Sequence, residues 1–289
     1  MPLRQLFPPL SGDGGCSKAQ ATEDNALVDT IAVHGEAGKL WLRDDLPART
    51  PNARISLYVY DSTVVYSSDR TSFIDKANFF LAERRAERIS DPTRPLILIG
   101  HSLGGLLIKQ ALINAYNNDR YRDIKLATQG LVFFATLHSG SNRSLAALGQ
   151  IAAKVARSLG MRREESVVQV LEQRTIFADL MQDLWKHRVL DCRILSFWGS
   201  RDDIVTKESA TFGLPGTHED VIPLNADHRS ICKFGNKQKD RDNLKLVNVN
   251  ITELYKEAIR QRERGELIAL SAVNNDETLQ SRFAGLRTS

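Results

Sequence analysis

Short apolar runs alternate along the chain with segments of helical periodicity. Runs of roughly four to eight apolar residues bounded by turn residues are typical of buried strands, whereas apolar residues three and four positions apart predict covering helices. The predicted strands are 27–33, 54–60, 96–99, 130–135, 192–198 and 221–224. The predicted helices are a short one at 41–46 and longer ones at 72–89, 106–115 and about 245–270. This alternation predicts an α/β fold, with a mostly parallel sheet covered by helices on both faces.

Three other stretches define the expected domain organisation. Residues 1–25 are rich in Gly, Ser and Pro, which predicts a flexible leader before a domain over 26–240. Within that domain, residues 144–187 hold two amphipathic helical patterns and no strand pattern. This helical insertion is interpreted either as a lid or as a core-packed helical pair, and the sequence favours neither. Residues 241–289 predict a C-terminal helical extension, which would serve as a linker if further domains follow.

One predicted strand and helix are joined by the turn Gly100-His101-Ser102-Leu103-Gly104. G-x-S-x-G between a buried strand and a helix is the context of a nucleophile elbow, a strained turn that projects the serine hydroxyl. Glycine is expected at positions 100 and 104, because the strand and helix pass so closely that a Cβ would clash. Ser102 is therefore the candidate nucleophile. The alternative is an ordinary glycine-containing turn, since the bare pattern is weak evidence.

A serine nucleophile needs a general base, and the chain has six histidines. In an elbow hydrolase the acid and then the base follow the serine in chain order. His228 comes just after the last predicted strand, where a loop can reach the serine. His187 falls in the helical insertion, His218 precedes its strand, and His138 could line the pocket. His228 is the candidate base.

The acid is expected in the loop after strand 192–198, which reads G-x-x-D-x-I-V. This pattern places the carboxylate on Asp202, with Asp203 and Glu208 as alternatives. A buried carboxylate there would orient the imidazole and stabilise the imidazolium.

The oxyanion of an acyl-transfer reaction needs two backbone N–H donors. One is expected from Leu103, the residue after the nucleophile, and the other from the loop after the first strand. Glu36 is the first choice in that loop, with its side chain pointing away, and Ala37 is the alternative. Each donor would be worth about 3 kcal/mol of barrier. The chemistry requires neither a metal nor an organic cofactor.

The composition limits the classes of binding partner that the sequence predicts. The 289 residues include 39 basic and 35 acidic side chains, and no Lys/Arg block is interleaved with aromatic residues. Nucleic-acid binding is therefore not expected, while a weak attraction to anionic membrane surfaces is compatible with the net charge of +4. Three cysteines without a C-x-x-C pair indicate a reducing compartment and no zinc site. No apolar run is long enough to predict a transmembrane helix, and the N-terminus lacks a signal-peptide pattern.

Several motifs together resemble a known family: VHGEAG, NARISLYVYDS, RPLILIGHSLGGLLIKQAL, GLVFFATLHSGS and IPLNADHRSICKF. They are similar to the α/β-hydrolase domains of serine-active-site-containing and GPI inositol-deacylase-like lipases. The nearest likeness is to hydrolase modules at the N-termini of fungal NACHT, NB-ARC or ankyrin-repeat proteins. The resemblance covers about residues 27–235. It implies the α/β-hydrolase fold, hydrolysis of ester or lipid-ester bonds, and Ser102 and His228 as nucleophile and base. For some members it also implies peripheral contact with ER or mitochondrial membranes.

Two loops depart from the pattern of that family. The usual H-G-L-G-G reads H-G-E-A-G at 34–38, and the usual G-T-P-H-R-G-S reads A-T-L-H-S-G-S at 135–141. Both are expected near the pocket mouth, so they bear on activity and substrate more than on fold.

The sequence thus predicts an intracellular, cytoplasmic serine hydrolase that cleaves small-molecule or lipid esters through Ser102, His228 and Asp202. A contrasting hypothesis is a weakly active or inactive hydrolase-fold module for interaction or signalling within a larger protein. Acyl transfer to an alcohol would use the same residues.

Overall fold

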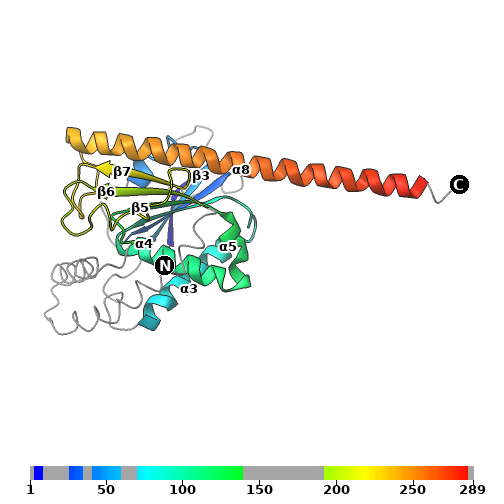
Figure 1. Ribbon diagram of the computed structural model, residues 1–289, viewed down its shortest axis with the longest axis horizontal. Coiled ribbons are helices and arrows are strands. Elements are labelled where there is room, and N and C mark those ends of the chain that lie inside the picture. The colour runs from blue at the N-terminus through cyan, green and yellow to red at the C-terminus, as the bar shows by residue number, and fades with distance from the viewer. Residues whose placement is uncertain (1–2, 9–25, 35–40, 60–69, 139–191, 286–289) are drawn as a thin grey trace.

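The computed structural model describes residues 3–8, 26–34, 41–59, 70–138 and 192–285 (Figure 1). Seven strands in these residues form one sheet in the order β1-β3-β2-β4-β5-β6-β7. Only β1 is antiparallel to its neighbour, β3, and the other neighbours pair in parallel. The strands are β1 (Leu3–Phe7), β2 (Val28–His34), β3 (Ala53–Val59), β4 (Leu96–His101), β5 (Thr128–Phe134), β6 (Arg193–Gly199) and β7 (Glu219–Leu224).

Helices cover both faces of the sheet (Figure 1). α3 (Arg70–Glu87), α4 (Leu103–Tyr116) and α5 (Arg122–Ala127) lie on one face, with the short 3₁₀ helix η2 (Asp119–Tyr121) before α5. α8 (Gln238–Gly285) lies on the other face, to which α1 (Trp41–Asp44) also contributes. The α/β class, mostly parallel and covered on both faces, is confirmed.

The core is split by the sheet into two apolar layers, because successive residues of a strand point to opposite faces. In β4, Ile97 and Ile99 belong to the layer under α8, whereas Leu96 and Leu98 belong to the layer under α3 and α4. A strand buried on both faces reads as an unbroken apolar run, which explains why β4 was predictable.

Helix α8 packs through one stripe of side chains and then continues beyond the sheet (Figure 1). The buried stripe comprises Val247, Ile251, Leu254, Tyr255 and Ala258, spaced at helical intervals. The helix is 48 residues long, and it starts earlier and ends later than predicted. Neither α8 nor any other helix in the described residues is long and apolar enough to cross a membrane.

Two parts of the expected organisation differ from the structure or lie outside it. Residues 3–7 fall in the predicted flexible leader, yet they form β1 and pair with β3 at the edge of the sheet. The sequence LRQLF gave no strand signal, because its strand is short and its pairing partner lies about fifty residues away. The rest of the leader, 9–25, and the helical insertion, 144–187, lie outside the described residues.

A buried ionic cluster ties the amino ends of the strands together. Asp29 in β2 accepts hydrogen bonds from Arg54 in β3, from Arg88 after α3 and from Arg94 before β4. The three guanidinium groups also donate to nearby backbone carbonyls or to the carboxylate of Asp91. Asp29 is 2% exposed, so these contacts are shielded from water. The cluster lies at the opposite end of the sheet from the carboxyl ends of the strands.

Candidate active site

The site is built at the carboxyl ends of the parallel strands, where ligands of such sheets bind. Ser102 directly follows β4, Asp202 lies in the loop after β6, and His228 lies in the loop after β7. The sheet order places β5 between β4 and β6. Three loops that are distant in sequence therefore meet at one edge of the sheet, as the sequence predicted for these candidates.

Ser102 occupies a backbone conformation that side-chain-bearing residues rarely adopt. Its φ is 51° and its ψ is −116°, and it caps the amino end of α4. The Ser102 N–H donates to the carbonyl of Phe134 at 2.9 Å, which ties the turn to the end of β5. The strain is the one expected of a sharp strand-to-helix turn that pushes a hydroxyl outward.

Glycines allow the strand and the helix to pass this closely. A Cβ on Gly104 would stand 2.3 Å from the Val33 carbonyl oxygen, and one on Gly100 would stand 2.5 Å from the Gly105 Cα. The expectation that positions 100 and 104 require glycine is therefore confirmed. Gly105, which the sequence did not single out, is equally constrained, because its Cβ would stand 2.2 Å from the Thr136 hydroxyl.

The strained serine therefore sits between a central parallel strand and a helix, in a sheet with one antiparallel edge strand and helices on both faces. This is the α/β-hydrolase fold.

Within this fold, the three candidate side chains form a hydrogen-bonded chain. His228 Nε2 lies 3.0 Å from Ser102 Oγ, and His228 Nδ1 lies 3.0 Å from Asp202 Oδ2. A carboxylate oxygen only accepts, so Nδ1 carries the imidazole proton and Nε2 is left to accept from the serine hydroxyl. The arrangement allows a proton to pass from the serine to the imidazole.

Asp202 is held in a fixed orientation. Its side chain is 0% exposed, and its Oδ1 accepts from the backbone N–H groups of Ile204 and Val205, both at 2.9 Å. These donors turn the other oxygen towards His228. Of the three carboxylates considered from sequence, the structure places Asp202 against the imidazole, whereas Asp203 and Glu208 are exposed.

The loop that carries His228 is organised by its own hydrogen bonds. Asp227 Oδ1 accepts from the N–H groups of Arg229 and Ser230, both at 3.0 Å. The pKa of Asp227 is lowered: burial alone would raise it, but hydrogen bonds, those of Ser230 first, outweigh that effect. His228 itself is buried.

Only one of the two expected oxyanion donors lies in the described part of the chain. Leu103 is the first residue of α4, and the first N–H groups of a helix have no intrahelical acceptor. Its N–H is therefore available beside Ser102. Glu36, like Ala37, lies in 35–40, outside the described residues.

Two further ionisable side chains are buried on the α4 side. His138 is stacked on Phe212 with ring centroids 3.7 Å apart and meets Phe133 edge-on. Burial, and secondarily the nearby Lys109, lowers the pKa of His138 well below its usual value. Burial also lowers the pKa of Lys109 to about 7. Neither ring nitrogen of His138 has a hydrogen-bond partner among the described residues, so His138 does not belong to the hydrogen-bonded chain of Ser102, His228 and Asp202.

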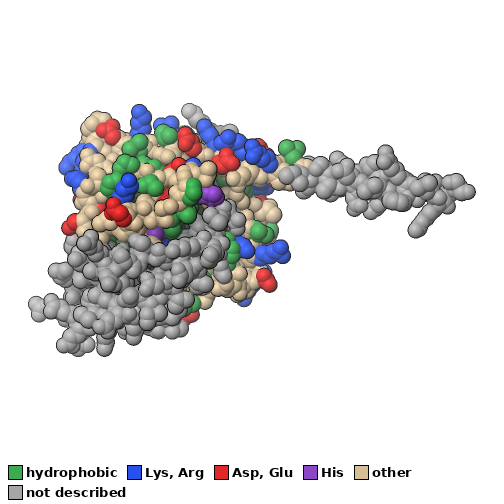
Figure 2. All heavy atoms as spheres, in the orientation of Figure 1, with side chains coloured by type: hydrophobic (Ala, Val, Ile, Leu, Met, Phe, Trp, Pro, Cys, Tyr) green, Lys and Arg blue, Asp and Glu red, His purple; other side chains and the backbone are tan. Residues whose placement is uncertain are grey.

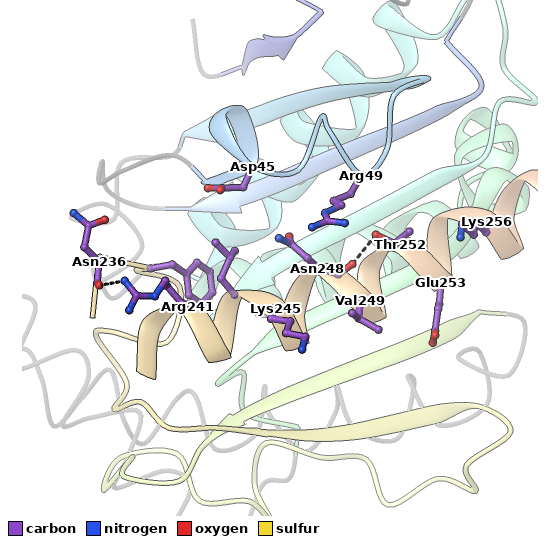
Figure 3. Close-up of a pocket in the computed structure, with 13 residues that line it drawn as sticks. Asp45, Arg49, Asn236, Arg241, Lys245, Asn248, Val249, Thr252, Glu253 and Lys256 are labelled. Carbon is purple, nitrogen blue, oxygen red and sulfur yellow. Dashed lines mark hydrogen bonds between the residues drawn. The ribbon is translucent and has the colours of Figure 1, made fainter. Parts of the chain in front are cut away.

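A separate groove runs along α8 (Figure 3). It has a volume of about 670 Å³ and lies between one side of α8, the segment after α1 and the Phe234–Asn236 turn. Its walls mix basic residues such as Arg49 and Lys245 with acidic residues such as Asp45. None of Ser102, Asp202 and His228 lines it, so it is not the acyl site. Among the described residues, no group of His, Cys, Asp and Glu could hold a metal ion.

Charged side chains of the described residues are visible along the α8 side of the molecule (Figure 2). Basic and acidic side chains intermingle on the face that carries α8 (Figure 2), in keeping with a net charge of +4.

Comparison with known proteins gives distant relatives. The chain is 26% identical over 230 residues to protein SERAC1 of Mus musculus, which covers 74% of this chain and 32% of that protein. It is 28% identical over 218 residues to SERAC1 of Homo sapiens, covering 70% of this chain and 30% of that protein. The chain thus spans about a third of the length of the curated relatives it matches. No protein-family model matches the chain.

Solved structures are similar only at a low level. The RedJ thioesterase of Streptomyces coelicolor is 16% identical, with a TM-score of 0.49, over 86% of this chain and 97% of that one. The peroxisomal α/β-hydrolase Lpx1 of Saccharomyces cerevisiae is 14% identical, with a TM-score of 0.49, over 90% and 88%. At this distance neither structure informs on the substrate.

Proposed function

We propose that this chain is a serine hydrolase that cleaves carboxylic ester bonds, lipid esters included, through an acyl-enzyme. The observation that carries the proposal is the continuous hydrogen-bonded chain from Ser102 Oγ through His228 to the buried Asp202. Ser102 also has a positive φ, the strained backbone conformation of a turn that projects a nucleophile. A serine, an imidazole and a carboxylate held in this order are the parts needed to activate a hydroxyl near neutral pH.

The reaction follows from the positions of the protons. Ser102 Oγ attacks the acyl carbon while its proton moves to His228 Nε2, and Asp202 stabilises the resulting imidazolium. The Leu103 N–H, with a second donor from the loop at Glu36, stabilises the oxyanion. The alkoxide leaves with the proton from His228, and the acyl group remains on Ser102. Water, losing a proton to His228, then attacks the acyl-enzyme. The bond between the acyl carbon and Ser102 Oγ breaks, His228 returns the proton to Oγ, and the carboxylic acid is released.

The substrate class follows from the chemistry of the proposed site. No step above needs a metal or organic cofactor, and the reacting partner is a small-molecule or lipid ester. Because the matched stretch covers 74% of this chain but only 32% of the mouse relative, the hydrolase is proposed as one module of a larger protein. The part of α8 beyond the sheet would then link it to further domains (Figure 1).

Hydrolysis of an ester panel tests the proposal. Aryl and lipid esters of graded acyl length are incubated with the purified chain and with Ser102→Ala, Asp202→Asn and His228→Gln. We expect measurable hydrolysis by wild type and a loss of about 10³-fold or more for Ser102→Ala and His228→Gln. Ser200→Ala is the matched control, because Ser200 is exposed in the loop that precedes Asp202.

A folded wild-type chain without activity on any ester would contradict the proposal. It would favour the contrasting function, an interaction or signalling module that keeps the fold without the reaction. Product analysis with added alcohol separates hydrolysis from acyl transfer, since transfer yields a new ester in place of the free acid.

A further inference from the structure

We infer that His101, the residue before the nucleophile, is a positioning residue that holds His228 through the backbone carbonyl of His228. This inference rests on the proposed function and adds a fourth side chain to its machinery. The decisive contact joins His101 Nε2 to the carbonyl oxygen of His228 at 3.0 Å. In the expected motif, position 101 is only the variable residue of G-x-S-x-G, so the pattern assigned it no role.

The contact fixes the state of the His101 ring. A carbonyl oxygen can only accept, so His101 Nε2 must carry a hydrogen and donate it. In its neutral form the ring is therefore the Nε2–H tautomer. The centroids of the two imidazole rings lie 5.2 Å apart and the ring planes are inclined at 40°.

Two consecutive residues thereby hold His228 from two sides. Ser102 contacts the ring of His228, and His101 contacts its backbone. His101 is itself fixed, because it closes β4 in register with Phe134 of β5. Any drift of the loop away from the nucleophile would have to break the bond to His101.

The other end of the His228 loop is held to the loop after β6. The N–H of Arg201 donates to the Ala226 carbonyl at 3.1 Å, and a Cβ on Gly199 would stand 2.6 Å from that same oxygen. Ala226 is thus held to the acid loop after β6, and His228 to the nucleophile strand β4. The loop of His228 is therefore fixed both to β4, which Ser102 follows, and to the loop that carries Asp202. This positions the ring of His228 for its two 3.0 Å contacts, with Ser102 and with Asp202.

The test compares two substitutions that differ in one donor. His101→Gln keeps an N–H donor near the position of Nε2, whereas His101→Leu keeps bulk and removes the donor. The readouts are the rate of covalent labelling by an excess of fluorophosphonate, kcat and KM on the best ester, and the melting temperature. One net hydrogen bond lost should slow labelling and kcat by about 2- to 12-fold in His101→Leu, with KM unchanged. His101→Gln should recover most of that loss.

The possible outcomes distinguish a failure of this inference from a failure of the proposed function on which it rests. No labelling of folded wild type would overturn the proposed function and this inference together. Labelled wild type with His101→Leu reacting at the same rate would overturn the inference alone. Equal losses in His101→Gln and His101→Leu would also overturn it, since they would reflect ring packing and not the donor. If His101→Leu does not fold, His101→Asn replaces it, because its amide stops short of the carbonyl and should be slow where Gln is fast.

Discussion

Ser102 carries a conformational strain that can be measured apart from its chemistry. At φ 51° and ψ −116° only glycine is free of backbone strain, and this conformation costs other residues about 1–3 kcal/mol. Both Ser102→Gly and Ser102→Ala remove the hydroxyl, but only glycine also relieves the strain. We therefore expect Ser102→Gly to be more stable than Ser102→Ala by about 1 kcal/mol in urea unfolding, after the entropic cost of glycine.

Ser200 provides the matching pair, because it is exposed and does not have positive φ. There the glycine variant should be the less stable of the two. Equal stabilities of Ser102→Gly and Ser102→Ala would argue against a strained elbow.

His138 should make the protein sensitive to acid. Burial, with Lys109, lowers its pKa well below the usual 6.5, so the folded state resists a proton that the unfolded state binds. The free energy of unfolding should therefore be unaffected by His138 above pH 6.5 and should fall as the pH drops below it, by up to about 1.4 kcal/mol per pH unit. His138→Leu should flatten that decline in urea unfolding curves taken from pH 7.5 to 5.

His218→Leu is the control, since His218 is a partly exposed histidine at the amino end of β7 and has no comparable burial. It controls for the replacement of a histidine by leucine at another position of the chain. A decline that is as steep in His138→Leu as in wild type would show that other groups cause it.

The strand–turn–helix element depends on close approach between β2 and α4. A methyl on Gly104 would meet the Val33 backbone oxygen, and backbone cannot move aside as a side-chain end can. We expect Gly104→Ala to lower the free energy of unfolding by about 1–3 kcal/mol. It should also slow reaction at Ser102, because the amino end of α4 must shift. Gly216→Ala, with open space around its Cβ, should do neither, and a neutral Gly104→Ala would contradict this packing.

Elements were predictable where the local pattern alone determines them. The six predicted strands coincide with β2 to β7 within a few residues. The strands inside the sheet, such as β4, were predictable because strands buried on both faces read as apolar runs. β1 was missed because its stability comes from pairing with β3 and not from its own pattern. The small helix α5 was also missed, since six residues hold too few turns for periodicity to appear.

The candidate site was only partly predictable, because local sequence patterns do not determine how distant loops meet. Chain order and strand ends led to Ser102 and His228 as candidates, and the structure brings these two side chains together. The choice among Asp202, Asp203 and Glu208 depends on the path of one loop, which neighbouring backbone donors fix. The contact of His101 with the His228 carbonyl depends on two loops meeting, and no local pattern carries that information.

At the scale of the whole molecule, the candidate site and the buried ionic cluster lie at opposite ends of the sheet. The carboxyl ends gather the candidate site, while the amino ends are joined by Asp29 and its three arginines. Asp29→Asn would leave three buried guanidinium groups without their shared charge. We expect a loss of about 3–5 kcal/mol in the free energy of unfolding.

The remaining folded Asp29→Asn protein should react at Ser102 as fast as wild type, because the cluster lies at the far end of the sheet. Asp220→Asn breaks the partly exposed pair with Arg193 and should cost at most about 1 kcal/mol. Equal losses in the two variants would contradict a structural role for the cluster.

The most direct measurement of the central claim is the covalent adduct itself. The native chain is treated with a fluorophosphonate, its intact mass is recorded, and the modified peptide is sequenced by mass spectrometry. The account predicts one adduct per chain, located on Ser102, abolished in His228→Gln and by prior unfolding. A folded chain that gains no adduct, or gains it on another residue, would contradict it.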